Sequence, residues 1–170
     1  MKKLLDQFHI NLESLVGLHR KLLDLLRMEK EALIAAELKK VQEVTNAKEV
    51  LLNDIQASEN DRQKLVSELS IVMKVPRKDL KLSRLIVEIQ ADFQKHATQF
   101  RSALNALSFL IQRITEQNKE NASLVKESMR HIERMKQNVL SESKKSSEVY
   151  SKSGSRVNPA RDSRLISKEI

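Results

Sequence analysis

Apolar residues recur at seven-residue intervals along most of this chain of 170 residues. Near the start, one series comprises Leu5, Leu12, His19, Leu26 and Leu33, and a companion series comprises Phe8, Leu15, Leu22, Glu29 and Ala36. This spacing places the side chains in one stripe along an α-helix. Leu18 and Leu25 widen the stripe, which predicts contact with more than one neighbour. The chain has only two Gly and two Pro, too few turn-forming residues for a sandwich or barrel of short strands.

The seven-residue repeat changes phase after the first helix. Leu33 and Leu38 are five residues apart, so one straight helix cannot keep both stripes towards one partner. We therefore predict a break near Ala35–Glu37 and an antiparallel helical hairpin. No Gly or Pro marks this turn, and the alternative is one uninterrupted helix through residue 73. Pro76 ends the second helix, because the residue before a proline is disfavoured in helical conformation.

A second long repeat begins near Asp92. One series comprises Ala97, Leu104, Ile111, Asn118, Val125, Ile132 and Val139, and its companion comprises Phe100, Leu107, Ile114, Asn121, Ser128 and Met135. A shorter segment, 80–91, also has helical spacing and is either a separate helix or the start of the long one. The sequence thus predicts an all-α fold, an elongated antiparallel bundle of three long helices, with a possible short one, within residues 1–142. Its helices would span about 3–35, 37–73, 80–91 and 92–142.

Composition changes near Ser141. Residues 141–170 contain nine serines with Gly154 and Pro159, so we expect a flexible, Ser-rich, basic tail over 143–170. The formal net charge of +8 is spread without a dense basic block, and aromatic residues make up only 3%. A nucleic-acid surface is therefore less favoured than mixed-charge, solvated helix faces.

The sequence contains no recognisable catalytic or metal-binding pattern. It has no cysteine, none of its four histidines has a second histidine three or four residues later, and no Gly-rich phosphate loop is present. We expect no enzymatic activity, no metal and no cofactor, and we interpret His19 as a packing residue. No apolar run approaches the length of a membrane span, and the expected location is the cytoplasm.

Polar residues interrupt the predicted stripes at two places. Asn118 and Asn121 occupy consecutive positions of the last repeat. Such residues fix the register of packed helices; alternatively they mark the point where the helix leaves its own bundle and meets a partner. Glu59 and Arg62 interrupt the second helix, and a local ion pair between them is sufficient to explain this.

Helix length provides a functional hypothesis. The hairpin helices are each about 33–37 residues long and the last pattern is about 51, so roughly 15 residues, about 20 Å of helix, would project beyond the hairpin. That part keeps an apolar stripe of Val125, Met129, Ile132, Met135, Val139 and Leu140. A stripe without an internal partner indicates a protein-binding site, and the methionines would make it adaptable. Ordinary core or a homodimer contact are the alternatives.

Four segments, in order, resemble the FlgN-type flagellar export chaperones. The likeness covers about residues 5–155. The segments are Leu22–Leu33 for the first helix, Lys48–Leu52 with Glu59, Arg62 and Leu65 for the second, Asn118 with Asn121–Val125 for the entry to the last helix, and Tyr150–Gly154 for the tail. Residues 156–170 extend past the usual tyrosine–glycine ending.

The resemblance implies a cytoplasmic, type III flagellar export chaperone. Such a protein binds amphipathic C-terminal helices of hook–filament junction proteins, prevents premature assembly and assists delivery to the export gate. By this likeness, client binding would involve Leu124, Val125, Met129, Ile132, Met135, Val139 and Leu140, and Tyr150 would contact the gate. The alternatives are a structural coiled-coil protein that self-associates through the same stripe and, third, a basic helical nucleic-acid binder.

Overall fold

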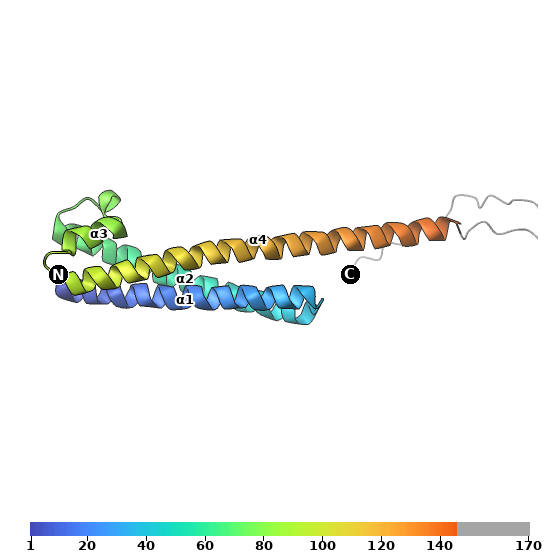
Figure 1. Cartoon of the computed structure of the whole chain (residues 1–170), viewed down its shortest axis with the longest axis horizontal. Helices are drawn as coiled ribbons and strands as arrows, with labels where there is room; N and C mark the ends of the chain where they lie inside the picture. The colour runs from blue at the N-terminus through green and yellow to red at the C-terminus, as the bar shows by residue number, and fades with distance from the viewer. Residues whose placement is uncertain (146–170) are drawn as a thin grey trace, which may run out of the picture. The chain divides into compact units, whose positions relative to one another are not determined.

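The computed structural model describes the backbone of residues 1–145 and the side chains of residues 1–140. Every regular element in this part of the chain is helical, which confirms the all-α class. The elements are α1 (Lys2–Ile34), α2 (Leu38–Met73), the short 3-10 helix η1 (Arg77–Asp79), α3 (Leu82–Ile89) and α4 (Gln94–Lys145) (Figure 1). The chain divides into two units after Val125, and α4 contributes residues to both.

The break between α1 and α2 lies where the repeat changes phase, so the alternative of one helix through residue 73 is wrong. Ala36 adopts a left-handed conformation with φ of 55°. Its N–H donates to the Leu33 carbonyl at 3.2 Å, and the Glu37 N–H donates to the Ala32 carbonyl at 2.9 Å. Glycine usually occupies such a position, because a Cβ makes the left-handed region unfavourable by about 1 kcal/mol. The turn therefore lacks its common sequence marker.

The end of α2 repeats this geometry. Lys74 is left-handed with φ of 57°, and the Val75 N–H donates to the Ser70 carbonyl at 3.1 Å. Pro76 follows and leads into η1. α3 is separate from α4, and α4 continues to Lys145, three residues past the predicted boundary at 142. The rest of the predicted tail, residues 146–170, lies outside the described residues.

In the first unit, α1 packs against both other long helices. Asn11 of α1 donates to the Ser58 carbonyl of α2 at 2.9 Å, and Glu29 of α1 pairs with Lys48 of α2, so these helices are antiparallel. In contrast, α4 runs parallel to α1. The α1–α4 contacts, in chain order, are Asp6 with His96, Phe8 with Phe100 and Leu26 with Asn121. A face widened by Leu18 and Leu25 is consistent with these two neighbours.

Fully buried side chains lie where the start of α4 packs on α1, and α3 belongs to the same apolar cluster. Phe8 and Phe100 are fully buried and form an edge-to-face pair with ring centroids 5.2 Å apart. Leu85 and Ile89 of α3 join the same apolar cluster, as does Leu69 near the end of α2. This concentration of buried side chains positions the start of α4 on α1.

Only one of the two predicted series of α4 lies at the centre of its buried face. Phe100, Ile114 and Asn121 are buried, whereas Ile111 is 51% exposed and Asn118 is exposed. The flank that packs instead comprises Ala103 and Leu110. Of the two roles predicted for Asn118, register control is therefore wrong, because a side chain exposed to solvent does not fix the packing of two helices. A seven-residue repeat defines a stripe, but the neighbouring helices decide which edge of the stripe they cover.

Candidate functional site

A polar junction marks the last buried position of α4 among the described residues. Asn121 is 4% exposed, and its Nδ2 donates to the Leu26 carbonyl at 2.8 Å and to Glu29 Oε2 at 2.9 Å. The other oxygen of Glu29 accepts from Lys48 Nζ of α2 at 2.5 Å. Gln117 donates to Asn121 Oδ1 at 3.0 Å. One carboxylate on α1 thus connects α2 and α4, which supports register control as the role of Asn121.

The predicted client-binding stripe lies just beyond this junction in sequence. Leu124 is half-buried, whereas every described side chain from residue 125 through 140 is exposed. The exposed fractions are 42% for Val125, 59% for Met129, 65% for Ile132, 67% for Met135, 66% for Val139 and 54% for Leu140. Steps of three and four residues place Val125 through Val139 of this series on one side of the helix, and Leu140 adjoins Val139. Tyr150, the predicted gate contact, lies outside the described residues.

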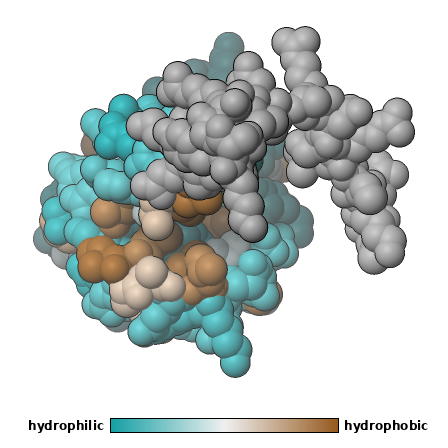
Figure 2. Space-filling model, turned by 90° about the vertical axis from the view of Figure 1, so that its right-hand side faces the viewer, coloured by the Kyte–Doolittle hydropathy of each residue, from teal (hydrophilic) through white to brown (hydrophobic). Residues whose placement is uncertain are grey.

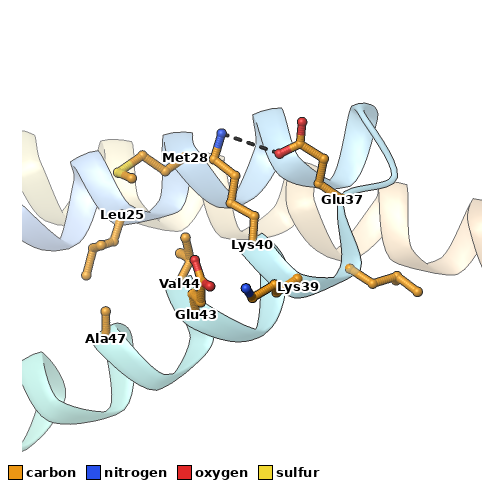
Figure 3. Close-up of a pocket in the computed structure, with 9 residues that line it drawn as sticks. Leu25, Met28, Glu37, Lys39, Lys40, Glu43, Val44 and Ala47 are labelled. Atoms are coloured by element: carbon orange, nitrogen blue, oxygen red, sulfur yellow. Dashed lines mark ion pairs between the residues drawn. The ribbon is translucent and has the colours of Figure 1, made fainter.

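The structure adds a feature that sequence reasoning missed, a groove between α1 and α2. Two adjoining hollows of about 590 and 410 Å³ share Leu25, Met28 and Ala47. Figure 3 shows Leu25 and Met28 of α1 on one side, and Val44 and Ala47 of α2 on the other. We call this the α1/α2 groove; its apolar lining comprises Leu25, Met28, Leu38, Val44, Ala47, Val50 and Leu51. It is open and apolar.

Exposed apolar side chains of α2 contribute to the groove. Leu38 is 82% exposed and Val50 is 64% exposed, whereas Val44 and Leu51, which line the same groove, are buried. Figure 2 shows apolar residues gathered within a largely hydrophilic surface. The sequence offered one sign of this groove, the widening of the α1 stripe at Leu25. It did not show that α2 leaves the Leu25 edge of α1 uncovered.

A third hollow of about 500 Å³ continues along the same helix pair. It shares Asp54 with the 410 Å³ hollow and has a more polar lining, including Asn11, Ser58 and Asp61. Acidic side chains therefore accompany the hollows along α2, and the third hollow also has apolar lining residues, Ile10, Leu18, Ala57 and Leu65.

Titratable groups of the first unit form structural pairs. His96 Nε2 lies 2.8 Å from Asp6 Oδ1, and this hydrogen bond lowers the pKa of Asp6. Arg62 donates to both carboxylate oxygens of Glu59, at 2.6 and 2.7 Å, which lowers the pKa of Glu59 and agrees with the predicted local ion pair.

His19 is the histidine that we interpreted as a packing residue. It is half-buried, and its Nδ1 lies 2.7 Å from the Leu15 carbonyl. A backbone carbonyl can only accept, so this nitrogen donates, as expected for a packing histidine. Within the described residues, no cluster of three or more His, Asp or Glu side chains could hold a metal ion. No described helix combines the length and apolar character needed to cross a membrane.

Comparison with known protein families gives a match over most of the chain. A family model described as "FlgN protein" matches residues 1–158, which include all the described helices. The comparisons with curated proteins and with solved structures returned no match. Because the family match covers nearly the whole chain, this protein belongs to the FlgN family.

Proposed function

We propose that this protein is a flagellar export chaperone that binds the amphipathic C-terminal helices of hook–filament junction proteins. Membership of the FlgN family suggests the broader chaperone role. The clients, the cytoplasmic location, the type III export gate as destination and Tyr150 as the gate contact are parts of the proposal. Binding alone is sufficient for such a role, so we propose no enzymatic activity, cofactor or metal.

The exposed stripe of α4 is the observation that carries this proposal. Met129, Ile132 and Met135 present more than half of their surface to solvent at helical spacing. Contiguous exposed apolar surface is unusual on a soluble protein and indicates a binding site. A partner helix laid along this stripe would cover its own apolar face, which is the face through which coiled-coil clients assemble.

The composition of the stripe suits reversible binding. Unbranched methionine side chains adapt to partners of different shape, so the stripe would tolerate more than one client. Ser128 and Lys136 interrupt the stripe, because steps of three and four residues place them on its side of the helix. They limit the apolar area that a client helix can bury, and a moderate affinity permits later release at the export gate.

Client capture tests the proposed site. The full-length chain is co-expressed with candidate junction proteins, and Ile132→Asp and Met135→Asp are compared with wild type. Ile71→Asp is the matched control, because Ile71 is an exposed isoleucine of α2 outside the proposed site. We expect at least about a tenfold loss of affinity for the two stripe variants, since a charge replaces buried apolar contact, and no loss for the control.

Each alternative function has a different outcome in the same experiment. Equal client capture by Ile132→Asp and wild type would contradict the proposed site. A structural coiled-coil protein would lose its oligomeric state in the stripe variants without binding any junction protein. A nucleic-acid binder would show an affinity for nucleic acid that falls steeply with salt concentration.

A further inference from the structure

Within the first unit, α4 carries a row of exposed residues beside its packed face. Ile111 is 51% exposed, Val125 is 42% exposed, and Asn118 between them is also exposed. These three positions are seven residues apart, so they form one line along the helix. Thr115 and Ala122, both exposed, adjoin this line at steps of three and four residues. We name these five residues the exposed edge of α4, which is about 21 Å long.

The exposed edge belongs to the same seven-residue series as the proposed client site. The series continues in sequence from Ile111, Asn118 and Val125 to Ile132 and Val139, and α4 is one helix across all five positions. Val125 is common to the edge and the client site. A client helix that contacts Val125 through its own seven-residue repeat would meet Asn118 and Ile111 at its next two repeats. This continuity selects the client helix as the partner of the edge.

Asn118 holds the polar side-chain group of the exposed edge that remains free to bind. The Thr115 hydroxyl donates to the Ile111 carbonyl at 2.8 Å, and Ala122 has no polar side-chain group. Among the described residues, none forms a hydrogen bond with the Asn118 amide. The amide of Asn121 is different, because both its oxygen and its nitrogen are engaged.

A client helix over the exposed edge would remove water from the Asn118 amide. A buried amide without a partner weakens binding, so the client must present a polar side chain at the facing position. A shift of the client by one repeat would bring a different residue to Asn118 and leave the amide unsatisfied. A single polar residue within an apolar helix contact fixes the register of two helices in this way.

We propose that client helices extend over the exposed edge of α4 and that Asn118 selects the register in which they bind. The partner is an amphipathic helix whose apolar face carries one polar residue opposite Asn118. This inference rests on the proposed function and adds to it a second contact surface and a specificity-determining residue. Register control, which exposure excludes for Asn118 within the free protein, then belongs to the complex.

Client capture with variants of the exposed edge tests the extent of the contact. The probe is the junction protein that the full-length wild type captures on co-expression. Ile111→Asp should weaken capture at least about tenfold, because it places a charge in an apolar contact. Phe109→Asp is the matched control and should leave capture unchanged. Phe109 is 62% exposed and lies on the opposite side of α4, since two residues turn an α-helix by about 200°.

A second variant keeps this test decisive if the charged one is unstable. Ile111→Ala removes apolar contact area without adding a charge, and it should weaken capture about threefold or more. Circular dichroism checks that each variant folds. Where Ile111→Asp does not fold, the result for Ile111→Ala decides.

A double-mutant cycle tests the role of Asn118. Each polar residue on the apolar face of the captured client helix is changed to leucine in turn, and each client variant is measured with wild type and with Asn118→Leu. One client substitution should weaken binding to wild type about five- to tenfold but should not weaken binding to Asn118→Leu, which has no amide to satisfy. Asn105→Leu is the matched control, because Asn105 is an exposed asparagine of α4 outside the edge, and it should behave as wild type.

Three results would overturn the inference. Unchanged capture by both Ile111 variants would show that the client does not reach this part of α4. Equal effects of every client substitution on wild type and on Asn118→Leu would exclude Asn118 as the register residue. A dimer of the free chain that Ile111→Asp dissociates, measured by light scattering and with client capture unaffected, would assign the edge to a second copy.

The same measurements separate this inference from the proposed function. If Ile132→Asp loses the client while the Ile111 and Asn118 variants behave as wild type, the proposed function stands and only this inference fails. If wild type captures no junction protein, the proposed function fails, and this inference fails with it.

Discussion

The packed and exposed parts of α4 share one repeat but have different environments. In residues 94–121, Phe100 and Ile114 are buried against the first unit. In residues 126–140, Met135 occupies the equivalent repeat position, yet it is 67% exposed. The repeat therefore identifies a face that can pack, and it does not identify the partner.

Residue type also differs between the two parts. The packed part uses aromatic and small side chains that fit a fixed surface, such as Phe100, Ala97 and Ala103. The exposed part uses Met129 and Met135, whose flexible side chains suit a partner of variable shape. This contrast is expected if one part stabilises the fold and the other binds.

The largest effect should come from the aromatic pair. Phe100→Ala removes a fully buried side chain that packs on Phe8, and we expect a loss of about 3–5 kcal/mol in unfolding free energy. Met135→Ala, at the equivalent repeat position of the exposed part, should alter it by less than about 0.5 kcal/mol. Urea unfolding followed by circular dichroism measures both. Similar losses in the two variants would remove the distinction between the two parts.

A smaller effect should distinguish the two asparagines. Asn121→Ala leaves the Leu26 carbonyl and Glu29 without their amide donor, which should cost about 1–3 kcal/mol. Asn118→Ala, at an exposed position, should cost less than about 0.5 kcal/mol. The same urea assay applies. Equal costs would show that Asn121 does not anchor α4 on α1.

Glycine at the α1–α2 turn should raise the unfolding free energy, whereas the preceding substitutions lower it. Ala36→Gly relieves a left-handed residue, and we expect a gain of about 0.5–1 kcal/mol in unfolding free energy. Ala35, with φ of −77°, is the matched control, because Ala35→Gly adds only unfolded-state entropy and should not stabilise. A gain from Ala35→Gly equal to that from Ala36→Gly would show that the left-handed geometry is not the cause.

The smallest effect concerns Asp6 and His96, because Asp6 is largely exposed. Its folded pKa is lowered, mainly by the hydrogen bond from His96, so its stabilising contribution is present above the ordinary value of 3.8 and is lost as the pH falls through the lower folded value. An NMR titration of the Asp6 carboxyl carbon should show an upward pKa shift in His96→Phe. An unchanged pKa in that variant would exclude His96 as the main cause.

Local spacing was enough to predict much of the fold. The repeat and the scarcity of Gly and Pro indicated helices, and the phase change between Leu33 and Leu38 located the first turn even though its left-handed residue is Ala36. These properties follow from the chain itself, because helical periodicity and a shift in it are set by residues close in sequence. The exposed stripe near Ile132 was visible for the same reason.

Tertiary packing decided which side chains of a stripe are buried, a property that residue spacing does not determine. Asn118 and Asn121 both lie on the predicted stripe of α4, but only Asn121 donates hydrogen bonds to Leu26 and Glu29, more than ninety positions away. The α1/α2 groove likewise depends on which edges of two helices remain uncovered. Burial is a property of all the neighbours of a side chain, and those neighbours come from distant segments. The sequence by itself therefore determined helices and their apolar faces, and only the three-dimensional arrangement determined which faces were already occupied.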